Sequence, residues 1–325
     1  MENTNRFANF DGVSDDSDHF FLDSNKGKCF TDSKSDVYRT IMKEWKILEQ
    51  HLPESIYVRV YEGRIDLMRA AIVGAAGTPY HDGLFFFDIV FPSNYPKIPP
   101  KLYYHSFGYC PNPNLLPSGR VCLSLLNTWG GKKSEKWNPS GSTMLQVLLS
   151  IQALVLNDNP YYNDTAMAID RSLSRSRAYN ERVFLITCIT SVRLLRKPPI
   201  NFEAFVSAHF RDRAFRILSA CSEYANGRVS VGNYAFDLLP SSSSTNVHVS
   251  RRFKKQMAAL YPQLLQAFRI NGASLEGLVE HLEPQSKHSE NKSYGTLFKK
   301  VMKKIKIAFF GRRKTNDNNN RLESA

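Results

Sequence analysis

Apolar residues recur along the chain with two different periods, and each period predicts a different kind of element. From Ser35 to Gln50 they recur every three to four positions, which indicates an amphipathic helix capped by Ser35 or Asp36. Four runs rich in β-branched and aromatic residues follow, joined by short connections that contain Gly or Pro, at 56–61, 67–73, 83–91 and 101–105. Such runs favour an antiparallel meander of four strands.

Helical patterns dominate the second half of the chain. An apolar helix that Ser142 or Thr143 caps is expected to end near Asn157. Further helices are predicted at 174–195, 200–227 and 253–268. The fold class is therefore α+β: a four-stranded antiparallel meander packed with helices, followed by a C-terminal helical extension.

The same patterns divide the chain into four parts. Residues 1–35 form an acidic N-terminal arm, which we predict to be disordered because Asp, Ser and Asn dominate it. Residues 36–195 form a core domain and residues 196–272 a helical extension, within which 239–245 is typical of a flexible linker. Residues 273–325 form a basic C-terminal tail with an amphipathic helix.

Charge and cysteine usage exclude several classes of protein. The formal net charge is +13, but residues 285–325 alone carry eleven Lys and Arg against three acidic residues. The surplus is thus partly a property of the tail, and no nucleic-acid partner is expected. Five cysteines without a Cys-x-x-Cys pair argue against a disulfide framework and a cysteine-rich zinc site. A reducing compartment, cytoplasmic or nuclear, is the expected location.

The basic tail leaves its own role open. At 297–309 apolar residues cover one face and lysines cover the rest. A helix with peripheral membrane contact, a partner-binding helix and a nuclear targeting signal all fit this pattern, as does a solvated helix packed on its own domain. The N-terminus has no apolar signal region, and no run of about twenty apolar residues predicts a membrane span.

The candidate chemistry lies at 112–125, which reads NPNLLPSGRVCLSL. A turn at Gly119 precedes a short β-type run, so Cys122 is expected at the edge of the core as a partly exposed nucleophile. Asn114 precedes Cys122 by eight positions, and a loop that doubles back would bring its amide beside the sulfur to stabilise an oxyanion. The alternative is a half-buried core cysteine beside an ordinary turn. His81 and His105 are expected to be surface or capping histidines, and no metal site is predicted.

Four motifs in this order resemble the ubiquitin-conjugating enzymes over about residues 36–195. They are GTPYHDG at 77–83, FPSNYPKIPP at 91–100, NPN followed by Gly119 and Cys122, and Trp137 followed by a Leu-rich helix and Asn159-Pro160. The large members with extensions are the most similar, namely the phosphate-homeostasis type of plants and the hybrid conjugase–ligases of animals. The stretch WKILEQHLPESIYVRVYEGRIDLMRA carries that closer resemblance.

The resemblance implies a two-step acyl transfer. Cys122 would accept ubiquitin as a thioester from a ubiquitin-activating enzyme, and a lysine of a protein substrate would then attack the thioester. Asn114 would stabilise the intermediate, Gly119 belongs to the same signature, and Asn112 stands where the family has a structural His. Because the activating enzyme uses the ATP, the chain itself is expected to need no cofactor and no metal.

Two departures from the family pattern affect the expected site. A family Asp that helps to deprotonate the acceptor lysine falls at Tyr162, a poor base at neutral pH, so Asp158, Asp164 or a partner would replace it. Lys97 stands where minimal members have an apolar residue that docks a ubiquitin ligase. Contacts with a ligase or another partner are expected at Lys97, Trp137, Asn138 and Pro139, and the need for a separate ligase stays open.

Two other functions remain open at this point. One is a non-catalytic ubiquitin-binding adaptor on the same fold, although such adaptors have lost the cysteine that this chain keeps at Cys122. The other is the same chemistry with a different ubiquitin-like modifier.

Overall fold

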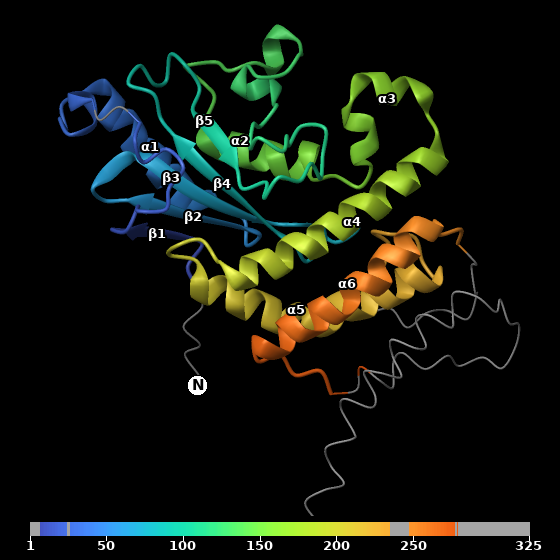
Figure 1. Ribbon diagram of the computed structural model, residues 1–325. Coiled ribbons are helices and arrows are strands. Elements are labelled where there is room, and N and C mark those ends of the chain that lie inside the picture. Colours follow the sequence, from blue (N-terminus) through green and yellow to red (C-terminus); the bar gives the residue numbers. More distant parts are fainter. Residues whose placement is uncertain (1–6, 25–26, 235–246, 277, 279–325) are drawn as a thin grey trace, which may run out of the picture.

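A computed structural model of the chain describes residues 7–24, 27–234, 247–276 and 278. A five-stranded sheet lies between two groups of helices (Figure 1). The predicted linker at 239–245 and the predicted amphipathic helix of the tail lie outside the described residues.

The sheet contains the predicted meander and one further strand. Its strands are β1 Phe10–Val13, β2 Ile56–Tyr61, β3 Arg64–Val73, β4 Leu84–Val90 and β5 Lys101–Tyr104. The order is β1-β2-β3-β4-β5; β2 to β5 pair antiparallel, and β1 pairs parallel with β2. The prediction of four antiparallel strands is confirmed, and β1 adds a parallel edge strand.

The helices follow the predicted periodicity closely, apart from the short helix at 165–170, which the pattern did not predict. They are α1 Asp36–His51, α2 Met144–Ser150, α3 Thr165–Asp170, α4 Leu173–Arg196, α5 Glu203–Asn226 and α6 Arg251–Ile270. Ser35 caps α1 by accepting from the Tyr38 amide, and Thr143 caps α2 by accepting from the Gln146 amide. A π-helical turn, η4 Ile151–Val155, continues α2 toward the predicted end near Asn157. No described helix is both long and apolar enough to cross a membrane.

Strand β4 is apolar at nearly every position because both of its faces are buried. Phe85 and Phe87 point into a core that includes α1 and α2, whereas Leu84 and Phe86 point into a second core with α4, α5 and α6. Successive side chains on a strand point to opposite faces. The extension therefore shares its core with the sheet.

The prediction of a disordered arm is wrong for residues 7–24 and 27–35. The backbone of β1 pairs with β2, and the ring of Phe7 stacks on Phe205 of α5 with 5.0 Å between ring centroids. The guanidinium of Arg59 lies 3.9 Å from the centroid of the Phe7 ring. A few aromatic anchors thus order a segment whose overall composition is polar.

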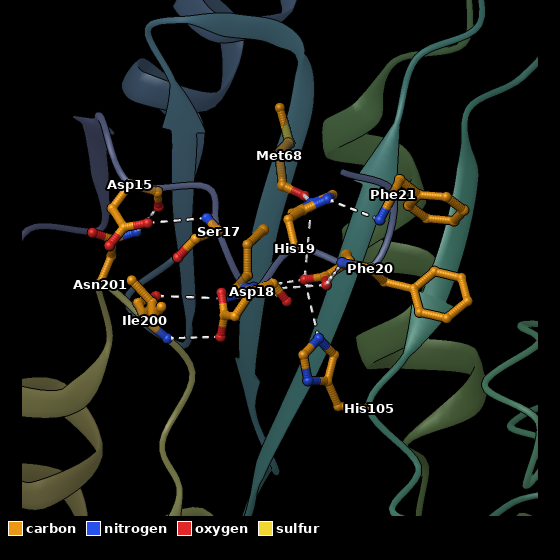
Figure 2. A network of polar contacts seen from close by, with 12 residues as sticks. Asp15, Ser17, Asp18, His19, Phe20, Phe21, Met68, His105, Ile200 and Asn201 are labelled. Atoms are coloured by element: carbon orange, nitrogen blue, oxygen red, sulfur yellow. Dashed lines mark hydrogen bonds and ion pairs between the residues drawn. The ribbon is translucent and has the colours of Figure 1, made fainter. Parts of the chain in front are cut away.

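Asp15 and Asp18 of the arm also make polar contacts, as Figure 2 shows. Arg69 of β3, which is fully buried, donates to Asp88 of β4 at 2.6 Å and to Asp18 of the arm at 2.6 Å. The other carboxylate oxygen of Asp18 accepts from the Ile200 amide at 3.0 Å, and the Asp15 carbonyl accepts from the Asn201 side chain at 2.7 Å. The arm therefore joins the sheet to the turn between α4 and α5.

The extension is tied to the β3–β4 connection by polar contacts as well. Asp82 accepts from Arg216 of α5 at 2.7 Å, and the Asp82 carbonyl lies 2.9 Å from Nε2 of His209. His81 is buried between Asp82 and the hydroxyl of Tyr224, which corrects its prediction as a surface or capping histidine. Its two ring nitrogens are both engaged, as burial of a polar ring requires.

Candidate active site

Cys122 and Asn114 lie side by side, because the loop between them doubles back as its sequence predicts. The Cys122 amide donates to the Asn114 carbonyl at 2.8 Å. In return the Asn114 side-chain nitrogen donates to the Cys122 carbonyl at 2.9 Å. One asparagine thus binds both the amide and the carbonyl of Cys122. These two bonds fix the backbone of the cysteine and with it the orientation of its side chain.

The thiol is less exposed than the sequence suggests. Cys122 is only 5% exposed, since it sits between the buried residues Val121 and Leu123. Burial raises the pKa of the Cys122 thiol, and the positive charge of Arg120 lowers this pKa in part. The neutral thiol therefore predominates near pH 7, and the reaction must remove its proton.

The segment after Cys122 folds back against it. Thr128 accepts from the Leu123 amide at 2.9 Å and donates to the Val121 carbonyl at 2.8 Å, so its hydroxyl bridges the two neighbours of the cysteine. The Ser124 hydroxyl donates to the Gly130 carbonyl. Residues 130–136, which include three exposed lysines, are thereby held close to the site.

Asn112 is a buried structural residue, which agrees with the role expected of the family His that it replaces. It has no solvent exposure, and its side-chain nitrogen donates to the Tyr80 hydroxyl at 2.9 Å and to the Val155 carbonyl at 2.7 Å. Its side-chain oxygen accepts from the Asn114 amide at 2.8 Å. Asn112 therefore holds the backbone of Asn114 in place.

Gly119 makes the turn that returns the chain to Cys122. Its φ is +84°, and a Cβ at this position would lie 2.1 Å from the ring of Tyr103. Both the left-handed backbone and the close ring demand glycine here. The Gly119 carbonyl accepts from the Tyr104 amide at 2.7 Å, which attaches the turn to β5.

The three residues expected to assist deprotonation of the acceptor lysine differ in their exposure and in their hydrogen bonds. Asp164 caps α3 by accepting from the Ala166 amide at 2.8 Å. Asp158 is exposed, and its carboxylate accepts only a side-chain hydrogen bond from Asn159 at 2.8 Å among the contacts of the described residues. Tyr162 is half-buried in the 3-10 turn η5 Pro160–Asn163, with its ring 5.4 Å from that of Tyr161.

The residues predicted to contact a partner divide into an anchor and an exposed surface. Trp137 is buried, and its indole nitrogen donates to the Pro96 carbonyl at 2.7 Å. Trp137 thus fixes the Pro-rich loop instead of offering its ring to a partner. Lys97, Asn138 and Pro139 are exposed, and Ile98 beside Lys97 is 46% exposed.

Sequence reasoning missed Asn163 and Tyr80, which support the site from outside the motif. Asn163 of η5 donates to the side-chain oxygen of Asn112 at 3.3 Å, across 51 positions of sequence. The Tyr80 hydroxyl donates to the Pro111 carbonyl at 3.1 Å while accepting from Asn112. The repeated asparagines at 157, 159 and 163 were the one signal of this network in the sequence.

Among the described residues, no cluster of three or more His, Cys, Asp and Glu side chains could hold a metal ion. The chemistry that this arrangement can perform is that of a thiol nucleophile whose backbone is held by an amide donor. Acyl transfer through a thioester needs these groups.

Comparison with known proteins points to one family. Residues 40–186 match the family model described as ubiquitin-conjugating enzyme. The chain is 50% identical over 287 residues to the "Probable ubiquitin-conjugating enzyme E2 24" of Arabidopsis thaliana, covering 86% of this chain and 30% of that protein. It is 43% identical over 293 residues to the "Putative ubiquitin-conjugating enzyme E2 38" of the same plant, covering 88% of each.

A more distant relative is human. The chain is 34% identical over 242 residues to the "Dual E2 ubiquitin-conjugating enzyme/E3 ubiquitin-protein ligase BIRC6", covering 70% of this chain and 5% of that protein. The chain thus spans less than a third of the length of several relatives that it matches.

Proposed function

Because this chain belongs to the ubiquitin-conjugating enzyme family, we propose that it accepts ubiquitin as a thioester on Cys122 and transfers it to a lysine of a protein substrate. The observation that carries this proposal is the reciprocal pair of hydrogen bonds between Cys122 and Asn114. These bonds support the proposal because they hold the Asn114 amide against the backbone of the residue that would carry the thioester.

In the first step, the Cys122 sulfur attacks the thioester carbonyl that ubiquitin forms with the activating enzyme. The new C–S bond forms as the old one breaks, the thiolate of the activating enzyme leaves, and the Cys122 proton passes to it or to water. Exchange of one thioester for another changes the bond energy little. The chain therefore needs no energy source of its own for this step.

In the second step, a neutral lysine amine attacks the thioester carbon and the carbonyl oxygen becomes negative. The Asn114 amide nitrogen carries two hydrogens, so one can stay on the Cys122 carbonyl while the other turns to the oxyanion. Collapse of the intermediate forms the isopeptide bond and expels Cys122 as a thiolate, which takes up a proton.

The attacking amine must first lose a proton, and among the three candidates Asp158 is the exposed carboxylate that caps no helix. Asp164 is engaged as a helix cap, and Tyr162 is not a base at neutral pH. Asp158 is exposed, so a lysine from another protein can approach it. Replacement of Asp158 by Asn should slow lysine discharge near pH 7 more than near pH 9, where more of the amine is neutral.

The test is a charging assay with activating enzyme, ubiquitin and ATP. A band larger by one ubiquitin that disappears with a thiol reductant is expected. It should be absent from Cys122→Ala and retained in Cys110→Ala, the control thiol of the same loop. A wild-type protein that binds ubiquitin and never forms the band would support the adaptor instead. Other ubiquitin-like modifiers in the same assay test the choice of modifier.

The variant Asn114→Ala separates the two steps. We expect it to charge normally and to discharge to lysine about 10²–10³-fold more slowly, the usual loss for one oxyanion donor. Discharge from purified thioester should be unaffected by EDTA, because we propose that the chain uses no metal or cofactor.

The further partners and the location of the chain are also proposals. A ubiquitin ligase would dock on the exposed residues Lys97, Ile98 and Pro139, and Ile98→Asp should then abolish ligase stimulation while charging is kept. A cytoplasmic or nuclear location fits the free thiols of the chain. Residues 285–325 fused to a fluorescent protein would show whether the basic tail directs the chain to a nucleus or a membrane surface.

A further inference from the structure

The C-terminal end of the α2–η4 helix is capped by side-chain amides. A helix end leaves carbonyl groups without a partner from the following turn, and a π-helical turn is often found at functional sites. Here the Leu154 carbonyl accepts from Asn157 at 2.8 Å and from Asn163 at 3.2 Å. The Val155 carbonyl accepts from Asn112 at 2.7 Å and from Asn163 at 3.3 Å.

Asn163 stands at the centre of this group. Its side-chain nitrogen also lies 3.3 Å from the Asn112 oxygen, so its two hydrogens are shared among three acceptors, and its side-chain oxygen accepts from Asn157 at 2.7 Å. The Asn157 contact fixes which way the Asn163 carboxamide points. Its nitrogen is thereby held toward both the helix end and Asn112.

Asn112 links Asn163 to the residues proposed to react. Its oxygen, the acceptor of the Asn163 bond, also accepts from the Asn114 amide at 2.8 Å. Asn114 in turn binds both backbone groups of Cys122. A continuous series of hydrogen bonds thus runs from η5, through two asparagines of the NPN loop, to the nucleophile.

We propose that Asn163 is a positioning residue for lysine discharge, one that holds Asn112, and through it Asn114, at the end of the α2–η4 helix. The inference rests on the proposed function, since it concerns the second step of that reaction. Displacement of a reacting group by about 1 Å can cost about 10²-fold in rate. Asn163 acts through Asn112, so we expect its loss to slow discharge by about tenfold and charging by less than about twofold.

A purely structural role is distinguishable, because the 158–163 loop has independent attachments. Asn180 of α4 donates to the Asp158 carbonyl at 2.9 Å, and Ser176 donates to the Asn159 side chain at 3.3 Å. Asn180→Ala is therefore the matched control: it removes one amide-to-carbonyl bond from the same loop without touching Asn112. It should discharge at close to the wild-type rate at pH 9.5, where more of the amine is neutral and the base proposed at Asp158 matters least.

The experiment measures single-turnover discharge of purified ubiquitin thioester to free lysine from pH 6.5 to 9.5. Asn163→Ala, Asn114→Ala, the double variant and Asn180→Ala are compared with the wild type. We expect the Asn163→Ala deficit to be the same at every pH, because the oxyanion and not the amine proton is affected. The double variant should be no slower than Asn114→Ala alone, since the two residues act through one group.

Three results would overturn the proposal: wild-type discharge in Asn163→Ala, a deficit that vanishes at high pH, or losses that multiply in the double variant. If Asn163→Ala is unstable, Asn163→Asp keeps the size and the acceptor for Asn157 but replaces the donor to Asn112 by an oxygen that repels it. A loss of at least about tenfold is then expected, and its absence counts against the proposal. Failure of the wild type to form any thioester would instead contradict the proposed function.

Discussion

Asn114 meets Cys122 through the backbone of the cysteine, at 2.9 Å from its carbonyl oxygen, and not through the sulfur. The amide therefore has a structural bond in the resting chain and a hydrogen to spare for the reaction. The structural role of this amide and the catalytic role proposed for it are thus compatible. A substitution at Asn114 removes both, so its effect on folding has to be measured beside its effect on rate.

The raised pKa of Cys122 predicts how its reactivity depends on pH. Burial raises the pKa of this thiol, so alkylation of Cys122 by iodoacetamide should increase about tenfold per pH unit from pH 7 through pH 9. Because the charge of Arg120 lowers the same pKa, Arg120→Gln should slow alkylation at pH 7.5 by about twofold, as a screened surface charge allows. Mass spectrometry of the peptide that contains Cys122 follows the reaction.

Arg39→Gln, an exposed charge change on α1, is the control and should leave the rate unchanged. A rate that levels off below pH 8 would show that the thiol ionises more easily than its burial implies.

Gly119 predicts a steric effect that can be separated from backbone strain. Gly119→Ala would place a Cβ 2.1 Å from the Tyr103 ring at a φ of +84°, and we expect a loss of about 3 kcal/mol or more in unfolding free energy. Gly108→Ala has nearly the same φ, +82°, and nothing within 4 Å of the new Cβ. It should cost only about 1 kcal/mol, the strain alone. Urea unfolding measures both, and equal losses would contradict the steric account.

At the scale of single residues, the sequence predicts those site residues that lie within one loop. Asn112, Asn114, Gly119 and Cys122 are found by spacing because a single turn brings them together. Asn163 is 51 positions from Asn112, and Tyr80 is 32 positions from it, so only the tertiary fold joins them. The exposure of Cys122 was overestimated for a related reason, since Thr128 and the segment after it fold back over the site.

Among the elements, helices and antiparallel strands were predictable, whereas β1 was not. Phe10–Val13 is too short and too polar to show an alternating pattern, and its pairing partner, Val58, lies 48 positions away. The arm is ordered instead by groups that meet it in space, namely Arg69, Asp88 and Phe205. A prediction of disorder from composition alone takes no account of such tertiary contacts.

The ion pairs of the arm predict unequal losses. Asp88 and Arg69 are both fully buried, so Asp88→Ala leaves the buried guanidinium of Arg69 with only the partly exposed Asp18 as its carboxylate partner and should destabilise the chain by about 3–5 kcal/mol. Asp18 is 32% exposed, and Asp18→Ala should cost about 1 kcal/mol. Urea unfolding of the two variants makes the comparison. Similar losses would mean that Asp18 contributes as much as Asp88 to the stabilisation that Arg69 provides.

For the whole molecule, the contact between α5 and the β3–β4 connection makes stability depend on pH. Burial lowers the pKa of His209 to about 3, so the ring stays neutral in the folded chain and gains a proton on unfolding below pH 6.5. Stability should therefore fall as the pH drops. From pH 7 to pH 5 this group alone should remove about 2 kcal/mol.

His209→Gln keeps a donor for the Asp82 carbonyl and cannot titrate, so its stability should change less between pH 7 and pH 5. His19, whose pKa burial also lowers, remains in both proteins and contributes equally. Chemical unfolding at the two pH values provides the measurement. An identical pH dependence in the variant and the wild type would exclude His209 as the titrating group.

The enclosure of the sheet limits how a large molecule can reach this chain. Helices cover β3 and β4 on both broad sides, so within the described structure a protein of ubiquitin's size has access to them only at the rims. The run that carries Cys122 lies on one rim, where Arg120 bridges to Tyr103 of the edge strand β5. In the proposed reaction, donor and acceptor proteins would share that rim, and steric competition there would set the order in which they bind and leave.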